Sequence, residues 1–193
     1  MQNFNEIQAL MKSEIDLMNK ILTDRLDSNV ELINKMSQYI INSGGKRIRP
    51  LILLLCAKAS DYRGDYHYSM AVVIELIHTA TLLHDDVVDQ SITRRGQESA
   101  NELWGNAPSV LVGDFLYSRA FEIMVEPNSM EIMKILSKAT NQISEGEVLQ
   151  LLNIKNSKVT QSEYYRVIER KTCLLYTSPS PRDATLSRMP SSA

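Results

Sequence analysis

The chain has 193 residues, of which 44% are hydrophobic and 23% charged, and its formal net charge is −2. These values fit one ordinary globular domain and argue against an electrostatic nucleic-acid binder. The two cysteines, Cys56 and Cys173, cannot form a disulfide framework. The longest apolar run, 51–57, is too short to be a transmembrane segment, and the polar start at 2–6 has no signal-peptide pattern. We therefore expect a protein of the reducing cytoplasm.

The spacing of apolar residues predicts helices as far as residue 172. In the first segment, Ile7–Leu22, apolar side chains recur at three- and four-residue steps. The same pattern in Val30–Ile41 ends before Gly44 and Gly45, which are typical of a helix stop. The helices expected downstream are Leu51–Ala59 after Pro50, Ser69–Val88, Ala107–Val125, Met130–Leu152 and Gln161–Lys171. No alternating strand pattern of useful length and no internal repeat appears, so the expected fold class is all-α, with helices around one core.

The last 21 residues differ from the rest of the chain. From Cys173 the sequence is CLLYTSPSPRDATLSRMPSSA, which is rich in serine and proline and has no helical period. One back-translation of CLLYTSPSPRD resembles a transposase-type sequencing-library adapter read in frame. We therefore expect residues 1–172 to be the authentic domain and residues 173–193 to be an adapter translation without native structure.

Three aspartates end the long apolar helix, in the segment HTATLLHDDVVDQSITRRG at 78–96. Asp85 and Asp89 are four residues apart, so a helix puts both on one face, and Asp86 adds a third carboxylate. Like charges at this spacing repel by roughly 0.2–0.5 kcal/mol, which a bound cation reverses. Magnesium suits the position, because it takes one or two carboxylates and completes its shell with water and substrate phosphate. Arg94 and Arg95 follow after a short break and suit phosphate oxygens, so the segment predicts a magnesium–diphosphate site.

Two glycines, three cations and a helix-starting proline form a second motif, GGKRIRP at 44–50. Helix N-termini bind anions through their free N–H groups and the helix dipole. Taken alone, such a loop is more simply a helix start with its cations in solvent. In one domain with the aspartate-rich helix, it predicts that two anionic groups are held in one cavity.

Six motifs occur in an order and at a spacing similar to those of the trans-prenyltransferases, the polyprenyl diphosphate synthase family. They are GGKRIRP, HTATLLHDDVVD, RRG, LVGDFLYSRAF at 111–121, EGEVLQL at 145–151 and KT at 171–172. The resemblance implies an all-α isoprenoid-synthase bundle, dimeric when full length, around a deep central cavity. It also implies that an allylic diphosphate is elongated with isopentenyl diphosphate units for quinone side-chain synthesis, and the overall similarity favours an octaprenyl product.

The resemblance assigns roles residue by residue. On the allylic side it implies Asp85, Asp86 and Asp89 as Mg²⁺ ligands, Arg94 on the diphosphate, and Lys171 and Gln150 near the allylic group. For isopentenyl diphosphate it implies contacts from Lys46, Arg49, His78 and Arg95. The implied chemistry is ionisation, in which Asp85, Asp89, Arg94 and Lys171 are the expected catalytic residues. The departing diphosphate is neutralised, and the C=C bond of isopentenyl diphosphate attacks the allylic cation.

Some of these polar residues have simpler interpretations. A lone histidine on an apolar helix, such as His78, is more often a satisfied core group than a site residue. His84 is expected to be structural, and Asp114 to fix local helix structure rather than bind metal. Glu145 and Glu147 fit either a polar cavity lining or exposed charges.

Small residues before the aspartates bear on product length. Ala80 and Thr81 lie about one turn from the metal face, at 1.5 Å per residue. The family carries aromatic residues at these positions when its products are short. Here the growing chain would pass towards Ile77, so the sequence predicts a product longer than geranylgeranyl.

The family also has a second aspartate-rich motif, whereas this chain has one Asp-Asp pair, at 85–86. We therefore expect residues 1–172 to be about the N-terminal half of the domain, and the chain to be inactive alone. Two other classes stay open. One is a non-catalytic helical partner subunit. The other is an HD-type metal phosphohydrolase, whose doublet His84-Asp85 would need further histidines besides His67 and His78.

Overall fold

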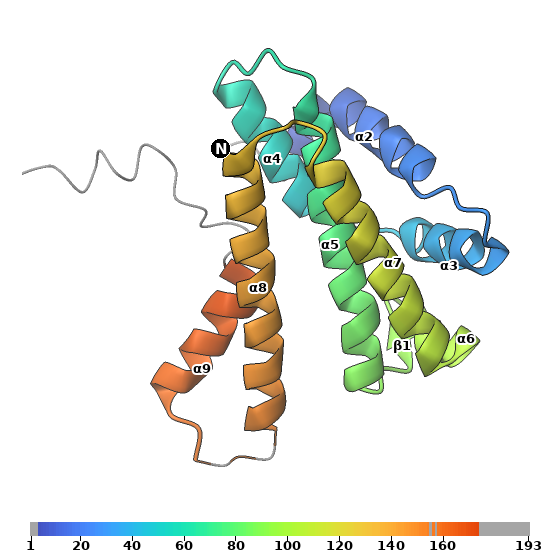
Figure 1. The fold of residues 1–193 in the computed structure, drawn as a ribbon, viewed down its shortest axis with the longest axis vertical. Coiled ribbons are helices and arrows are strands. Elements are labelled where there is room, and N and C mark those ends of the chain that lie inside the picture. Colours follow the sequence, from blue (N-terminus) through green and yellow to red (C-terminus); the bar gives the residue numbers. More distant parts are fainter. Residues whose placement is uncertain (1–3, 155, 157, 174–193) are drawn as a thin grey trace, which may run out of the picture. The chain divides into compact units, whose positions relative to one another are not determined.

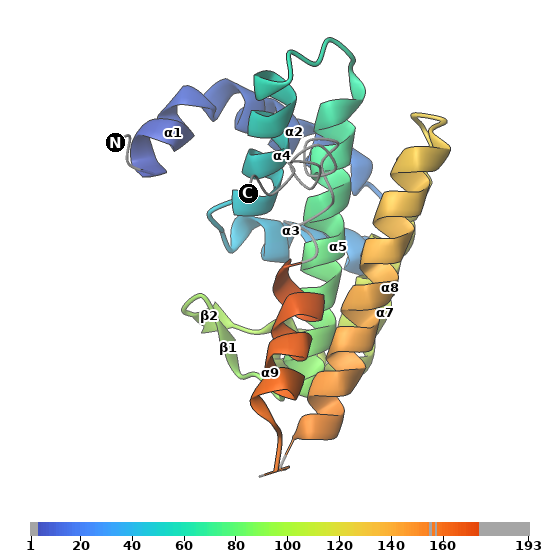
Figure 2. The same cartoon turned by 90° about the vertical axis from the view of Figure 1, so that its left-hand side faces the viewer.

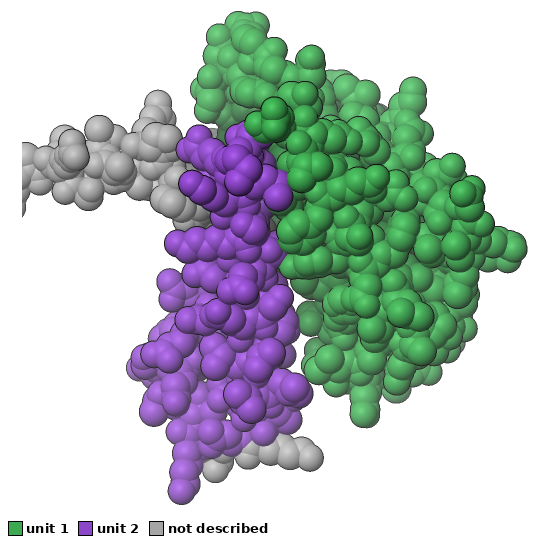
Figure 3. Space-filling model, in the orientation of Figure 1, with its two compact units in different colours: residues 1–128 green, residues 129–193 purple. Residues whose placement is uncertain are grey.

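The computed structural model describes residues 4–154, 156 and 158–173, with only the backbone described at 172 and 173. The chain divides into two compact units, Met1–Asn128 and Ser129–Ala193 (Figure 3). Apart from one short hairpin, the regular structure of the described residues is helical, which confirms the predicted all-α class. The adapter-like sequence expected at 173–193 lies, except for the backbone of its first residue, outside the described residues.

The N-terminal half of unit 1 follows the predicted helices closely. The first predicted helix is two helices, α1 (Phe4–Leu10) and α2 (Lys12–Arg25), because Met11 leaves helical geometry with φ −103° and ψ 14°. Next come α3 (Glu31–Asn42) and α4 (Ile48–Ala59). Pro50 lies in the first turn of α4, where a missing N–H costs no hydrogen bond.

Helix α5 (Tyr66–Val88) is the centre of unit 1, as Figures 1 and 2 show. It packs against α2 and α4, and against two helices that follow it, α6 (Ala100–Trp104) and α7 (Asn106–Met124). Eleven of its 23 residues are buried, as expected for a helix that is apolar on most sides. The carboxylates at its C-terminal end are therefore placed on a rigid element.

A two-stranded hairpin connects α5 to α6. Strands β1 (Thr93–Arg94) and β2 (Gln97–Glu98) pair antiparallel, with Arg94 opposite Gln97. Arg95 and Gly96 form the turn with φ values of 53° and 80°, and two successive positive φ angles are typical of a tight hairpin turn. The hairpin was not predicted from the sequence, because two residues per strand are too few to show alternation.

Unit 2 contains a long helix α8 (Met130–Asn153), a short helix α9 (Gln161–Ile168) and a π-helical segment η1 (Glu169–Cys173). The Ser129 hydroxyl caps α8, and α9 begins with a capping box between Thr160 and Glu163. Helix α8 contacts both α9 and η1. Across the two units, no helix of the described residues is both long and apolar enough to cross a membrane.

Candidate functional site

A pocket of about 460 Å³ lies in unit 1 beside the start of α4, the middle of α5 and the hairpin turn. We call it the basic pocket. The described residues that line it are Gly45, Lys46, Arg47, Ile48, Arg49, Glu75, His78 and Arg95. Four of these are cations and one is a carboxylate, so the pocket suits an anion. All four residues predicted to contact isopentenyl diphosphate are in this lining.

His78 is held in its neutral form inside the basic pocket. Burial lowers its pKa to about 3, and repulsion from Arg49, Arg95, Arg94 and Arg47 adds to the effect. Arg49 Nη1 lies 3.2 Å from His78 Nε2. Because arginine can only donate, Nε2 accepts this hydrogen bond and Nδ1 carries the proton. His78 therefore orients Arg49.

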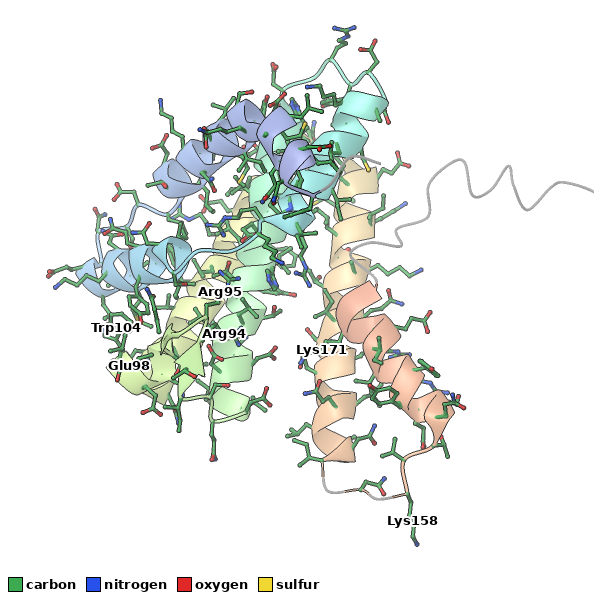
Figure 4. All side chains as sticks on the ribbon, turned by 180° about the vertical axis from the view of Figure 1, so that it is seen from behind. Arg94, Arg95, Glu98, Trp104, Lys158 and Lys171 are labelled. Atoms are coloured by element: carbon green, nitrogen blue, oxygen red, sulfur yellow. The ribbon has the colours of Figure 1, made fainter. Side chains whose placement is uncertain are left out.

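Arg95 packs directly against Gly45, in the loop before α4. A Cβ atom at Gly45 would lie 2.7 Å from Arg95 Nη1, so only glycine allows this approach. Burial lowers the pKa of Arg95 and repulsion by Arg47 contributes in the same direction, whereas Glu75 opposes them. Figure 4 labels Arg95 and Arg94, which lie on the side of α5 where the hairpin runs.

An ion pair that was not predicted from the sequence joins Arg47, in the loop before α4, to Glu75 of α5. Only 4% of Glu75 is exposed. A second guanidinium nitrogen of Arg47 donates to the carbonyl oxygen of Ile41 at 3.3 Å. One signal was present in the sequence, since Glu75 is the only carboxylate between Asp65 and Asp85. A single acid in an apolar helix indicates a buried partner.

The three predicted metal-binding aspartates have two different environments. Asp89 follows α5, but its N–H still donates to the Asp85 carbonyl oxygen at 2.8 Å, so both side chains keep the face that a helix gives them. Asp86 is only 2% exposed and accepts two hydrogen bonds from Arg94, at 2.7 Å from Nε and 2.6 Å from Nη2. These hydrogen bonds raise the pKa of Arg94. Asp86 is thus the hydrogen-bonding partner of Arg94 in this structure.

No group of three or more His, Cys, Asp or Glu side chains that could hold a metal ion occurs among the described residues. Asp85 and Asp89 supply two oxygen donors on one face. A pair of carboxylates fits Mg²⁺, which takes its other ligands from water and substrate phosphates.

The other histidines have structural surroundings. His84 Nε2 lies 3.3 Å from the Val110 carbonyl oxygen and 3.2 Å from Asp114 Oδ1, both on α7. The His67 ring lies 4.0 Å from that of Tyr68, at the other end of α5. The histidines of the chain therefore do not gather as an HD-type phosphohydrolase would need.

The residues predicted to govern product length lie in or beside the core of unit 1. Ile77 is 1% and Ala80 0% exposed. Thr81 is partly buried, and its hydroxyl donates to the His78 carbonyl oxygen at 2.8 Å. A larger side chain at position 80 would have to displace its neighbours.

Lys171 and Gln150 belong to unit 2. Lys171 Nζ forms an ion pair with Glu147 Oε2 at 2.7 Å, and Arg170 pairs with Glu145 (Figure 4 labels Lys171). Gln150 is partly buried on α8, three residues after Glu147. The two acids, which the sequence left open between two roles, thus hold η1 on α8. The roles of Lys171 and Gln150 near an allylic group stay predictions.

The chain is similar in sequence to known proteins of one family. The family model for polyprenyl synthetases matches residues 30–192. The chain is 48% identical over 174 residues to octaprenyl diphosphate synthase of Escherichia coli K12, covering 90% of this chain and 54% of that protein. It is 39% identical over 186 residues to a geranyl-diphosphate-specific all-trans-nonaprenyl-diphosphate synthase of Rhodobacter capsulatus, covering 96% and 57%.

Solved structures agree with the sequence comparison. A polyprenyl synthase of Caulobacter crescentus CB15, complexed with calcium and isoprenyl diphosphate, matches with a TM-score of 0.88 and 41% identity, covering 97% of this chain and 57% of that one. The chain thus spans about half the length of the curated relatives that it matches. From the family model, these identities and the shared fold, the chain belongs to the polyprenyl synthetase family.

Proposed function

We propose that the chain provides the diphosphate-binding part of a polyprenyl diphosphate synthase, which adds isopentenyl diphosphate units to an allylic diphosphate. The observation that carries the proposal is the basic pocket, where four residues from three separate motifs meet. Its volume of about 460 Å³ is within the range of small-molecule sites. Its excess of cations matches a diphosphate group.

In this pocket, Lys46, Arg49 and Arg95 bind the diphosphate of isopentenyl diphosphate. Arginine suits the task because its planar fork of N–H groups matches phosphate oxygens. His78 is neutral and accepts from Arg49, so it fixes the direction of that guanidinium without repelling the other cations.

The second diphosphate, that of the allylic substrate, binds at the C-terminal end of α5. Asp85 and Asp89 are the proposed ligands of Mg²⁺, which would neutralise the diphosphate as it leaves. Calcium, another divalent cation that prefers oxygen ligands, accompanies isoprenyl diphosphate in the Caulobacter relative. Asp86 holds Arg94 beside this face, where the guanidinium adds positive charge. Lys171 and Gln150 are proposed to lie near the allylic group, as the motifs predict.

The product is proposed to be octaprenyl diphosphate for a quinone side chain. The similarity to the Escherichia coli octaprenyl enzyme and the small residues Ala80 and Thr81 support it. A homodimer and a cytoplasmic location are proposed with it. A non-catalytic partner subunit is the alternative, but it would not require both sets of diphosphate-binding residues.

The proposal is tested by binding of inorganic diphosphate and isopentenyl diphosphate to the 193-residue chain, measured by calorimetry in EDTA. We expect saturable binding that weakens about tenfold or more in Arg49→Ala, since one charge-assisted contact of roughly 1.5–3 kcal/mol is lost. Arg63→Ala is the matched control, because the side chain of Arg63 is 84% exposed and does not line the basic pocket. A folded chain that binds neither compound, or an Arg49 variant that binds like the wild type, would contradict the proposal.

A further inference from the structure

We infer that Glu75 is a positioning residue, whose buried carboxylate holds Arg47 and through it the backbone of the Gly44–Arg47 loop and the start of α4. In this arrangement the loop presents Lys46, and the first turn of α4 presents Arg49, to the basic pocket before any diphosphate binds. The inference rests on the proposed function for its consequence, diphosphate binding, but its structural part can be tested separately.

The ion pair is built into the unit rather than lying on its surface. The side chain of Glu75 is 6% exposed and that of Arg47 13%. Glu75 belongs to the central helix α5, whereas Arg47 belongs to the loop before α4. Because the second nitrogen of Arg47 also donates to the Ile41 carbonyl oxygen, one side chain ties the loop to both α3 and α5. Breaking a buried pair of this kind leaves an uncompensated charge.

The loop backbone needs such a tether. Arg47 has φ 48° and ψ 36°, in the left-handed region that side chains other than glycine rarely occupy. Strained residues persist where their surroundings over-determine the conformation. Arg47 also precedes α4 without a side-chain cap. We therefore assign the restraint to its contacts with Glu75 and Ile41.

Electrostatics separates this role from a simpler one. A carboxylate among four cations weakens the binding of an anion if it acts only through its charge. Replacing it by a neutral isostere would then strengthen diphosphate binding. If Glu75 acts by positioning, the same replacement weakens binding although the pocket becomes more positive. The two roles predict opposite signs.

The test uses the full chain with Glu75→Gln, studied by amide hydrogen exchange and by diphosphate calorimetry. We expect the two hydrogen-bonded amides that flank the loop to exchange about tenfold faster or more, while those of α7 change little, because only the loop loses its restraint. These are Ser43, whose N–H donates to the Tyr39 carbonyl oxygen, and Leu51, whose N–H donates to that of Arg47. We expect diphosphate affinity to fall roughly tenfold. Glu126→Gln is the matched control, since it removes a glutamate that pairs with Arg25 at the surface and changes neither readout.

A double variant, Arg47→Gln with Glu75→Gln, tests whether the two residues act as one unit. We expect it to be no worse than the worse single variant, because contacting residues are non-additive. If Glu75→Gln fails to fold, Glu75→Asp replaces it and should exchange the same loop amides faster than the wild type, because the shorter side chain reaches Arg47 less well. Wild-type exchange in the folded variant that is used, or unchanged or tighter diphosphate binding, overturns the inference. If the wild type binds no diphosphate, the proposed function fails, and loop exchange alone decides the role of Glu75.

Discussion

At the scale of single residues, His78 shows how the basic pocket sets a protonation state. Its pKa of about 3 in the folded protein lies below the usual 6.5. As the pH falls below 6.5, the unfolded chain takes up the proton first. The free energy of unfolding is therefore unaffected above 6.5 and decreases as the pH falls towards 3.

We expect this loss to be on the order of 1–2 kcal/mol between pH 7 and pH 5, and to disappear in His78→Asn. Urea unfolding of both proteins at pH 7, 6 and 5 measures it, since other titrating groups cancel in the comparison. An imidazole signal of His78 that titrates near pH 6 in nuclear magnetic resonance spectra would refute the explanation.

Neighbouring aspartates are expected to differ in what they do. Asp86→Asn removes charge-assisted hydrogen bonds to Arg94 and should lower the free energy of unfolding by roughly 1.5–3 kcal/mol. Asp89→Asn changes an exposed side chain, so its stability should stay within about 0.5 kcal/mol of the wild type. In contrast, Asp89→Asn should weaken the Mg²⁺-dependent part of diphosphate binding. Urea unfolding and calorimetry with and without Mg²⁺ measure the two effects, and equal stabilities of the two variants would contradict this assignment.

At the scale of helices, one contact between α5 and α7 brings Gly113 against the ring of His84. A Cβ atom at Gly113 would lie 2.5 Å from His84 Nε2. Gly113→Ala should therefore lower the free energy of unfolding by about 1–3 kcal/mol, as overpacking does, although alanine favours helices. The control is Gly113→Ala combined with His84→Ala, which removes the ring and should recover part of the loss. Thermal unfolding compares the two, and a single variant as stable as the wild type would mean that the His84 ring moves aside at no cost.

Long helices could be predicted from the spacing of their apolar residues, whereas short elements depend on tertiary contacts that the sequence does not show. Helix α5 was predicted because its mostly apolar segment, Ser69–Val88, is longer than a typical strand. The hairpin is held instead by distant partners, such as the Tyr39 hydroxyl that donates to the Glu98 carbonyl oxygen at 2.8 Å. The interruption at Met11 has no Gly or Pro to mark it, and the helical spacing of apolar residues continues on both sides. One helix was therefore predicted where the structure has two.

At the scale of the whole molecule, motif order predicted which residues gather, but not how they contact one another. Lys46, Arg49, His78 and Arg95 all line one pocket. The Arg47–Glu75 pair was missed, because no spacing rule joins a loop residue to a helix residue 28 positions later. Similarly, the sequence placed three carboxylates together, and only the fold shows that Arg94 takes one of them.

Product length can be measured only with an active enzyme. The 193-residue chain has one Asp-Asp pair, and we expect no turnover from it alone. Joining residues 1–172 to the C-terminal part of the Escherichia coli octaprenyl diphosphate synthase, a 48% identical relative, should give an active chimera. Measured turnover by the 193-residue chain itself would show that expectation to be wrong.

In this chimera, Ala80→Phe should shorten the product by several isoprene units. The position is fully buried one turn before the aspartates, so a phenyl ring would fill space along the proposed path of the growing chain. The same ring can cost about 1–3 kcal/mol by overpacking, and Thr81→Phe, at a partly buried position, is therefore the second variant. Chromatography of the dephosphorylated products measures their length, and Ala80→Val is the control for a modest increase in volume. If both phenylalanine variants turn over and still yield the product of the parent chimera, the growing chain does not pass this face of α5.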